Sequence, residues 1–524
     1  MRVEAGGYIA DAVRRHRDRV AVSSNQGDQT FEELNSTANR IGSGLRKIGA
    51  LVGDRVGVLS YNRIEVLQAW IGLEKLGLVR VVLHSHFELA THAATLREVG
   101  AKVLMFDTRF AAAIEAQKEL FPSIRLFVAL GQNVPPWSIP LSQIIDQGSS
   151  QEPVLDVDED SPCFIQLTTG TTGRPKPWIV THRSWRAVIE GNFEHLDTFQ
   201  SDSQVLNTGD VNLHFHALQW ASGFQTLMPY LLRGARTVLV DDECFDARSL
   251  VDELVATHCT GMFVPGPLLT PLLDEVEARG GIAHHLKRLM IFFATPELLR
   301  RTSQVLGDVW CHGFGSTEQG APTTRLTAEE AREKPTRLES VGRSISPFYE
   351  LAIMGQNGIR LSATEVGEIV VRSPMCTSSY WGNTNSDSFF DGGWFRPHDV
   401  GYMDQDGFLY FLDRSKDQIR TERGVVYPHV IEAALLRHEA VANCGVVGLG
   451  NDVAHTIVAA VLLKKGVNPS PEIENALLCL AQSELTDTQQ AQRVCFVSEL
   501  PTVLGGAKVQ RGVLRSQLLE RGTL

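Results

Sequence analysis

The stretch CFIQLTTGTTGRPKPWIVTHR, residues 163–183, decides the fold and the chemistry of this chain. An apolar, strand-forming run leads into a series of threonines and glycines, and a lysine follows. Glycine lets a backbone bend tightly and bring its N–H groups close to a ligand. Backbone N–H groups, hydroxyls and one lysine together favour an anion. The stretch therefore predicts a loop that binds phosphate, with these candidate residues: Thr168, Thr169, Gly170, Thr171, Thr172, Gly173 and Lys176.

The loop differs from the GxxxxGK[ST] phosphate loop of many nucleotide-binding proteins. Lys176 lies six residues after Gly170, but Pro175 occupies the second glycine position. Pro177 stands where a Ser or Thr would bind magnesium. Proline on both sides of the lysine also keeps a helix from starting there with free N–H groups aimed at the anion. Taken alone, the stretch has a second interpretation, a Thr/Gly-rich surface turn without a ligand.

The composition is that of a soluble globular protein, with 43% hydrophobic and 21% charged residues. At 524 residues, the chain is too long for one core and predicts two or more domains. No apolar run approaches the roughly 18 residues that cross a bilayer. The net charge of −12, without a compensating basic run, argues against a nucleic-acid or anionic-membrane partner. The eight cysteines form no CxxC pairs, which favours a reduced, cytoplasmic setting.

Helical and strand patterns alternate in the first part of the chain. Residues 30–50 and 64–78 have helical spacing, and residues 54–60 and 101–107 are typical of strands. Strands separated by helices of this length predict a parallel, doubly wound sheet. A second block of the same kind runs from residue 204 to 310, with strands expected at residues 237–240, 261–264 and 289–293.

The sequence pattern changes after about residue 340, where short strand-forming runs separated by turns predict a β-rich subdomain. The remainder of the chain alternates strands and helices in a small α+β unit. We therefore expect an N-terminal domain over residues 1–413 and a C-terminal domain over residues 414–524. A unit of that size is suited to act as a mobile lid over chemistry that excludes water.

Five motifs, in order, resemble the adenylate-forming superfamily of acyl-CoA ligases, peptide-synthetase adenylation domains and luciferases. They are TTGTTGRPKPWIVTHR (168–183), HGFGSTEQG (312–320), WFRPHDVGYMDQDGFLYFLDRSKDQI (394–419), RGVVYPHVIE (423–432) and LPTVLGGAKVQRGVLR (500–515). The THR ending of the first motif is closest to the acyl-CoA ligase branch. The resemblance implies an α/β fold with a large N-terminal domain of two doubly wound α/β subdomains and a β-barrel subdomain. A small, mobile α+β C-terminal domain completes it.

The resemblance also assigns roles to residues on the nucleotide side. In the second motif, Gly315 would bind the nucleotide, and Thr317 and Glu318 would be catalytic. Glu318 would also bind a Mg²⁺ ion that bridges phosphate oxygens. Asp399 and Arg414 would hold the ribose hydroxyls. For these two residues the alternative is an ordinary surface ion pair, which contributes little energy.

Three further residues receive roles in the reaction itself. Lys508 would bridge the attacking carboxylate and the α-phosphoryl group, and so offset the repulsion between two anions. Lys416 aligns with the hinge about which the small domain turns. His216 matches the position that guards the acyl pocket, although a lone histidine in an apolar stretch is also typical of a core.

The implied activity is the ATP- and Mg²⁺-dependent activation of a carboxylic acid as acyl-AMP. Pyrophosphate leaves, and the acyl group passes to a thiol of CoA or of a carrier protein. One alternative is a diazotase-type enzyme that activates nitrite and couples it to an arylamine. Another is a nucleotide-binding protein without turnover, against which the retained Lys176, Glu318, Asp399 and Lys508 argue.

The chain departs from the pattern of the superfamily at several positions. Relatives carry glycine at the position before Asp399. At the stretch LMIFFATPELL, residues 289–299, they carry adjacent glycines before an Ala-Pro. Here Phe292 and Phe293 occupy the latter site, and they either narrow the pocket or pack into the core. The ATP side is therefore better supported than the acceptor side. The departures are Pro177, Phe292, Phe293, His398, Val430 and Ala507.

Overall fold

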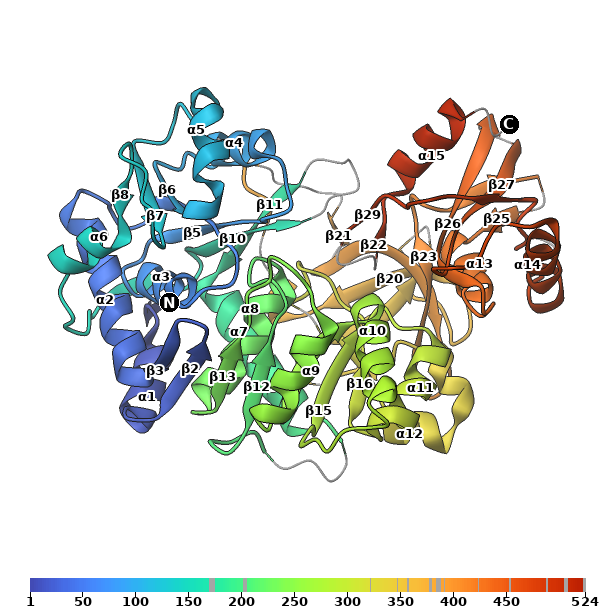
Figure 1. The fold of residues 1–524 in the computed structure, drawn as a ribbon, viewed down its shortest axis with the longest axis horizontal. Helices are drawn as coiled ribbons and strands as arrows, with labels where there is room; N and C mark the ends of the chain where they lie inside the picture. Colours follow the sequence, from blue (N-terminus) through green and yellow to red (C-terminus); the bar gives the residue numbers. More distant parts are fainter. Residues whose placement is uncertain are drawn as a thin grey trace.

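Two largely parallel sheets, a curled antiparallel sheet and a small C-terminal unit follow one another along the chain (Figure 1). The computed structural model describes residues 1–168, 175–200, 205–320, 322–345, 347–355, 358–376, 379–382, 388–390, 392–422, 424–451, 454–486, 489–503 and 508–521. The order of these units is the one that the sequence predicts.

The first sheet has seven strands, and its five central neighbours from β10 to β7 run parallel. Their order is β11 (Lys176–Thr181), β10 (Pro162–Thr168), β5 (Val79–Leu83), β4 (Arg55–Leu59), β6 (Val103–Asp107), β7 (Leu126–Leu130) and β8 (Ile139–Pro140). The apolar, β-branched stretches that predict strands at residues 54–60 and 101–107 form β4 and β6 at its centre. Buried strands of this kind read as continuous apolar runs.

The second sheet has nine strands and carries the second predicted α/β block. Its order is β18 (Arg343–Ser344), β17 (Thr324–Thr327), β16 (Trp310–His312), β15 (Arg288–Phe292), β14 (Gly261–Pro265), β12 (Val211–His214), β13 (Arg236–Leu239), β2 (Val20–Ser24) and β3 (Gly27–Thr30). From β16 to β2 the neighbours run parallel. The N-terminal hairpin of β2 and β3 thus joins a sheet whose other strands come much later in the sequence.

The β-rich unit predicted after residue 340 is a five-stranded antiparallel sheet. It is formed by β19 (Glu350–Met354), β20 (Gly367–Arg372), β22 (Trp394–Met403), β21 (Phe389–Phe390) and β23 (Leu409–Arg414). The C-terminal unit contains the sheet β26 (Val441–Asn451), β27 (Ala454–Leu463) and β28 (Arg493–Phe496), and the hairpins β24–β25 (Ile419–Thr421, Gly424–Val426) and β29–β30 (Thr502–Val503, Lys508–Val509).

Helices cover the sheets and connect their strands. Among the described residues, no helix combines the length and the apolar character that crossing a bilayer requires. The α-helices are α1 (Gly7–His16), α2 (Phe31–Lys47), α3 (Ile64–Lys75), α4 (Leu89–Glu98), α5 (Ala111–Ala116), α6 (Leu141–Gln147), α7 (His182–Asp197), α8 (Ala221–Leu232), α9 (Ala247–Ala256), α10 (Gly266–Ala278), α11 (Pro296–Leu306), α12 (Ala328–Glu333), α13 (Pro428–Leu435), α14 (Pro471–Glu484) and α15 (Arg511–Glu520).

Helix α7 begins directly after β11 because the THR ending of the opening stretch contains a helix cap. The Thr181 side chain accepts a hydrogen bond from the Ser184 backbone N–H, and Ser184 returns one to the Thr181 N–H. Such a reciprocal cap satisfies two backbone donors that the helix itself leaves unpaired. His182, the first residue of the helix, is thereby buried. The cap therefore fixes the residue at which β11, the strand after the predicted phosphate loop, ends and α7 begins.

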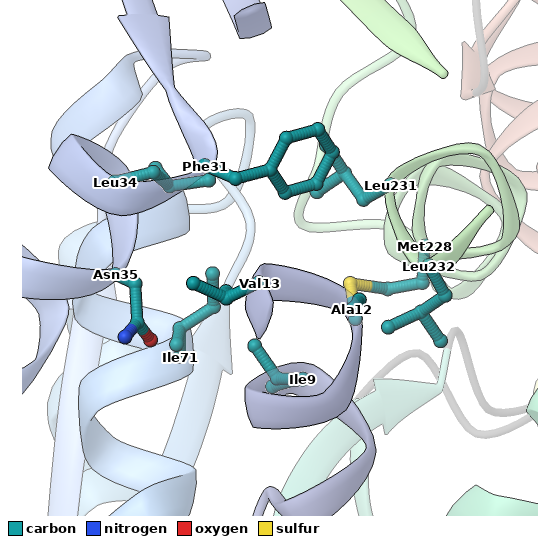
Figure 2. Close-up of a pocket in the computed structure, with 10 residues that line it drawn as sticks. All are labelled: Ile9, Ala12, Val13, Phe31, Leu34, Asn35, Ile71, Met228, Leu231 and Leu232. Carbon is teal, nitrogen blue, oxygen red and sulfur yellow. The ribbon is translucent and has the colours of Figure 1, made fainter. Parts of the chain in front are cut away.

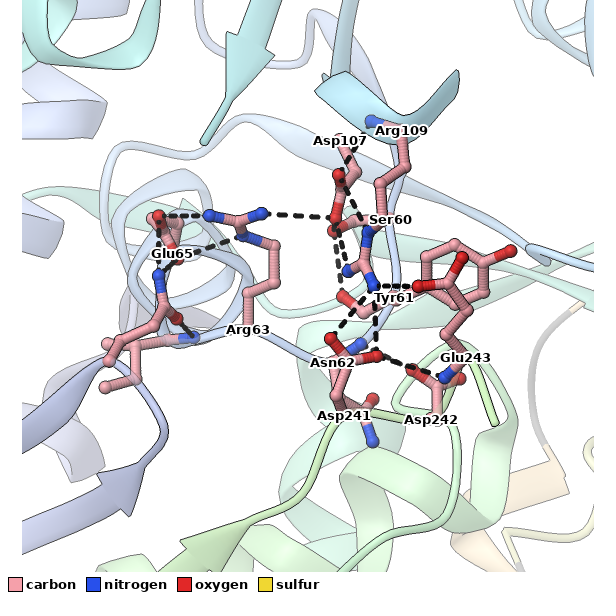
Figure 3. Close-up of polar contacts among 12 residues, drawn as sticks. Ser60, Tyr61, Asn62, Arg63, Glu65, Asp107, Arg109, Asp241, Asp242 and Glu243 are labelled. Carbon is pink, nitrogen blue, oxygen red and sulfur yellow. Dashed lines mark hydrogen bonds and ion pairs between the residues drawn. The ribbon is translucent and has the colours of Figure 1, made fainter. Parts of the chain in front are cut away.

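A polar seam joins the two parallel sheets where their strands end (Figure 3). Asn62, just after β4, donates from Nδ2 to the carbonyl oxygens of His216 and Val240, both at 3.1 Å. Its Oδ1 accepts from the Leu218 N–H at 2.8 Å. One side chain of the first sheet therefore satisfies three backbone groups that follow β12 and β13 of the second.

Arg109 strengthens the same seam from the end of β6. Its guanidinium lies 2.7 Å from Asp107, and it reaches across to Asp241 at 2.9 Å and Glu243 at 2.6 Å (Figure 3). The three carboxylates raise the pKa of Arg109, although burial opposes them as the largest single effect. The arginine is therefore charged at every physiological pH.

A small apolar cavity of about 20 Å³ lies between α1, α2, α3 and α8 (Figure 2). This volume is close to that of a single water molecule. Its one polar lining residue, Asn35, is already bonded to Glu152 and Lys75. The cavity is a packing gap, lined by Ile9, Ala12, Val13, Phe31, Leu34, Asn35, Ile71, Met228, Leu231 and Leu232.

Replacing Asn62 by Ala tests the seam. The change leaves buried backbone groups at His216, Leu218 and Val240 without their partner, and each such group costs about 1–3 kcal/mol. We expect a loss of roughly 2–4 kcal/mol, measured as a lower urea midpoint of the first unfolding transition. The exposed Gln117→Ala serves as control. Equal midpoints for the two variants would show that Asn62 does not hold the sheets together.

Candidate active site

Several predicted site residues lie where the strands of the two parallel sheets end. In the nine-stranded sheet, His216 follows β12, Phe293 follows β15 and the second motif follows β16. In the seven-stranded sheet, Thr168 ends β10. The carboxyl ends of parallel strands are the usual position for ligands in open α/β sheets.

Side chains link these two edges directly. Gln166 in β10 donates from Nε2 to the Gln219 carbonyl oxygen at 2.7 Å, and Gln219 donates in turn to the Ser60 carbonyl. His84, after β5, lies with Nε2 3.3 Å from the Leu167 carbonyl oxygen. The backbone that leads into the predicted phosphate loop is thus held from both sheets.

The tip of the predicted phosphate loop, residues 169–174, lies outside the described residues, but both of its stems are defined. Thr168 is buried at the end of β10 and pairs with Lys176, the first residue of β11. Pro177 fits this edge strand because proline lacks the N–H that a central strand would need. Its carbonyl oxygen accepts a hydrogen bond from the Trp381 N–H at 2.8 Å.

Glu318 contacts these stems through Tyr380, a residue that the sequence does not single out. The Tyr380 hydroxyl donates to Glu318 Oε1 at 2.7 Å, and the ring centre lies 5.4 Å from Lys176 Nζ. Burial, followed by the nearby Glu318 charge, raises the pKa of Tyr380. The tyrosine therefore stays protonated and donates to the carboxylate. Gly315 and Thr317 lie half-buried in the same loop.

The ring of Tyr380 is oriented by Trp178 of β11. Their ring centres lie 5.0 Å apart in an edge-to-face arrangement, and residues 178 and 380 form an isolated β-bridge. Edge-to-face aromatic pairs add about 0.5–1.5 kcal/mol to burial. The SYW sequence at residues 379–381 is the signal that could have found this residue, since it places two aromatic rings in a short polar segment.

Asp399 and Arg414, the predicted ribose pair, are direct cross-strand partners in β22 and β23. Arg414 Nε lies 3.7 Å from Asp399 Oδ1, and the carboxylate is buried while the guanidinium is partly exposed. His398, where relatives carry glycine, has a left-handed φ of 61°. Its ring lies 3.3 Å from Glu368, which stabilises this strained position.

His216 is buried, and its Nε2 lies 2.8 Å from Ser222 Oγ. Its ring packs edge-to-face on Phe263 at 5.0 Å. Burial, followed by the charges that His214 and His84 would carry, lowers the pKa of His216 to about 3. The ring is therefore neutral at physiological pH and suited to shape an apolar wall.

The two phenylalanines that replace glycines have different environments. Phe292 is 8% exposed, and its ring packs in a core cluster 5.6 Å from that of Phe263. Phe293 has a φ of 59°, and the residue is 51% exposed. Gly266 makes room for its carbonyl oxygen, because a Cβ there would lie only 2.2 Å away. Of the two interpretations, packing into the core therefore holds for Phe292 and does not hold for Phe293.

The C-terminal unit carries the remaining predicted residues. Lys416 lies in the turn after β23, with Nζ 4.0 Å from Asp417 Oδ1. Burial, more than the opposing Asp417 charge, lowers the pKa of Lys416. Lys508 is the first residue of β30, whose partner strand is β29. The glycine-rich residues 504–507 before it lie outside the described part of the chain.

The AMP-binding enzyme family matches residues 9–381, and the AMP-binding enzyme C-terminal domain matches residues 430–504. The chain belongs to the AMP-binding enzyme family. It is 30% identical to 2-succinylbenzoate–CoA ligase of Geobacillus kaustophilus, over 92% of each chain.

Solved structures share the fold. An anthranilate CoA ligase, AuaEII, in complex with anthranoyl-AMP has a TM-score of 0.89 and 21% identity, and the match covers 100% of this chain and 98% of that one. The amide bond synthetase McbA from Marinactinospora thermotolerans has a TM-score of 0.85 and 23% identity, over 98% of this chain and 100% of that one. The predicted α/β architecture is thereby confirmed.

The buried His216 predicts a pH dependence of stability. The unfolded chain binds a proton at this residue below its ordinary pKa of 6.5, whereas the folded chain does so only near 3. Lowering the pH from 7 to 5 therefore favours unfolding by about 2 kcal/mol for this group.

We expect His216→Asn to lose less stability than the wild type between pH 7 and pH 5, by about that amount, in urea unfolding. The exposed His285→Asn is the matched control and should follow the wild type. A His216 variant with the wild-type difference between the two pH values would contradict the burial of a neutral ring.

Proposed function

We propose that this protein is an ATP-dependent, AMP-forming acid–thiol ligase. It activates a carboxylic acid as acyl-AMP, releases pyrophosphate and transfers the acyl group to the thiol of CoA or of a carrier protein. Membership of the AMP-binding enzyme family and the CoA ligases among its relatives support this activity. The observation that carries it is the convergence of Thr168, Lys176 and Glu318 at the strand ends.

The phosphate end of ATP is assigned to the loop between β10 and β11. Thr168, Thr169, Gly170, Thr171, Thr172, Gly173 and Lys176 supply hydroxyls, backbone N–H groups and one cation. Glu318 suits a Mg²⁺ ion, because such ions are held by one or two carboxylates together with substrate phosphates. Tyr380 engages one oxygen of that carboxylate and so orients it. A Mg²⁺ ion bound there supplies positive charge to the phosphate oxygens.

The sugar end of ATP is assigned to Asp399 and Arg414. Their cross-strand pairing gives an acceptor and a donor side by side, as two neighbouring ribose hydroxyls require. Gly315 is assigned to nucleotide binding, and Thr317 to the catalytic group beside Glu318. His216 is assigned to the wall of the acid pocket. Because its ring is neutral, it does not offset the negative charge of the acid, and Lys508 is the residue assigned to do so.

Lys508 is assigned to the adenylation step. The acid oxygen attacks the α-phosphorus, a new C–O–P bond forms, and the bond to pyrophosphate breaks. A lysine between the two anions offsets their repulsion during the attack. The thiol then attacks the acyl carbonyl and AMP leaves. We assign the units to residues 1–413 and 414–524, with the small unit turning about Lys416 between the two steps.

Pyrophosphate release tests this function directly. A panel of aromatic and aliphatic carboxylates, together with nitrite, is supplied with Mg-ATP, each with and without CoA and an arylamine. We expect at least one carboxylate to give CoA-dependent turnover with one AMP formed for each pyrophosphate. Turnover of nitrite with an arylamine and without CoA would assign a diazotase-type reaction instead. Silence with every acid would support a nucleotide-binding protein without turnover.

Replacing Lys508 by Ala separates the two steps. We expect the rate of acyl-adenylate formation to fall by a factor on the order of 10² or more, because the variant lacks a positive charge that acts only during the attack. Thioester formation from preformed acyl-AMP should change less than about threefold. Lys465→Ala, at an exposed lysine of the same small unit, is the control. An equal loss of both half-reactions would refute the role of Lys508.

A further inference from the structure

The guanidinium of Arg511 lies among three carboxylates, those of Asp413 in β23 and of Asp417 and Glu432 in the C-terminal unit. Its Nη2 is 2.7 Å from Glu432 Oε2 and 4.0 Å from Asp413 Oδ2, and its Nη1 is 3.8 Å from Asp417 Oδ2. The side chain is 17% exposed. At 2.7 Å, the contact with Glu432 has the length of a strong, charge-assisted hydrogen bond.

Backbone groups hold two of these carboxylates in place. Asp413 Oδ2 accepts from the His429 N–H at 2.7 Å, and its Oδ1 accepts from the Arg414 N–H at 2.8 Å. Glu432 Oε1 accepts from the Val446 N–H at 2.7 Å. The carboxylates therefore define where the cation sits, and the cation offsets their mutual repulsion in a place with little water.

The four residues lie near the two features that the proposed reaction uses in the C-terminal part of the chain, the predicted hinge at Lys416 and the strand of Lys508. Asp413 lies before the predicted hinge Lys416 and Asp417 directly after it, while Glu432 lies in α13. Arg511 is the first residue of α15 and follows Lys508 by three residues. The Gln510 N–H donates to the Pro501 carbonyl oxygen at 2.8 Å, which closes the β29–β30 hairpin just before Arg511.

We propose that Arg511 is a positioning residue for adenylation: it anchors the strand that carries Lys508 to Glu432 and to the two sides of the hinge. This inference rests on the proposed function. Glu432 and Arg511 both follow Lys416, so their bond persists when the small unit turns. Asp413 precedes Lys416, so its distance to Arg511 depends on the orientation of that unit.

A displaced lysine should impair the attack on ATP and spare the later step. We expect Arg511→Met to lower the kcat of acyl-adenylate formation by about 10- to 100-fold, because a shift of about 1 Å at a reacting group costs up to 10². The KM for ATP should stay within about threefold, since the phosphate and ribose residues lie elsewhere. Thioester formation from preformed acyl-AMP should also stay within about threefold.

Companion variants keep this inference falsifiable if Arg511→Met folds poorly. Glu432→Gln keeps the shape of the anchor and removes its charge, and it should shift the half-reactions in the same direction by a smaller factor. Arg511→Lys restores the charge without the planar fork and should recover part of the adenylation rate. Arg521→Met, at the exposed end of the same helix, is the matched control.

The outcomes separate this inference from the proposed function. Variants that retain the thermal midpoint and the wild-type adenylation rate would overturn the role of Arg511 alone. An equal fall in both half-reactions would also overturn it, because it would indicate a general loss of structure. A wild-type protein that adenylates no acid would refute the proposed function, and the role of Arg511 would fall with it.

Discussion

The site depends on the seam between two separately formed sheets, and the Asn62 amide is its central contact. Either sheet alone would supply only the residues at the ends of its own strands, and the predicted site uses residues from both. The three side-chain hydrogen bonds of Asn62 to backbone groups near β12 and β13 fix one edge against the other. Since a buried backbone group without a partner costs about 1–3 kcal/mol, few other arrangements of these edges would be as stable. The Arg109 ion pairs then add charge-assisted contacts at the rim of the same seam.

Much of the fold could be predicted because its signals are local. The strands β4, β6, β13, β14 and β15 follow from short apolar runs, and the opening stretch already contains the cap of α7. The pairing of Asp399 with Arg414 agrees with the nucleotide motif that the two residues share. Nothing local indicates that β2 joins a sheet of strands some two hundred residues away, since that position is decided by packing between distant segments.

The residues that sequence reasoning missed are those whose role arises only from long-range contacts. Tyr380 belongs to no motif, and it matters because the chain returns to β11 and brings its hydroxyl to Glu318. The two phenylalanines show the opposite difficulty. Their residue type alone leaves both interpretations open, and the backbone decides: Phe292 ends a buried strand, whereas Phe293 turns outward in a left-handed conformation. Phe293 is therefore a strained aromatic residue at the edge where the predicted site lies.

Exposed ion pairs of Arg437 join the small unit to the rest of the chain. Arg437 of the small unit lies 3.1 Å from Glu339 and 3.6 Å from Glu297. The three side chains are between 32% and 50% exposed. Exposed pairs of this kind contribute about 0.2–1 kcal/mol each. The Glu432–Arg511 bond, by contrast, is short and largely buried. The short Glu432–Arg511 bond thus lies within the small unit, whereas the exposed Arg437 pairs cross its border. A partly buried hydrogen bond from the His429 N–H to Asp413, at 2.7 Å, crosses the same border beside Lys416.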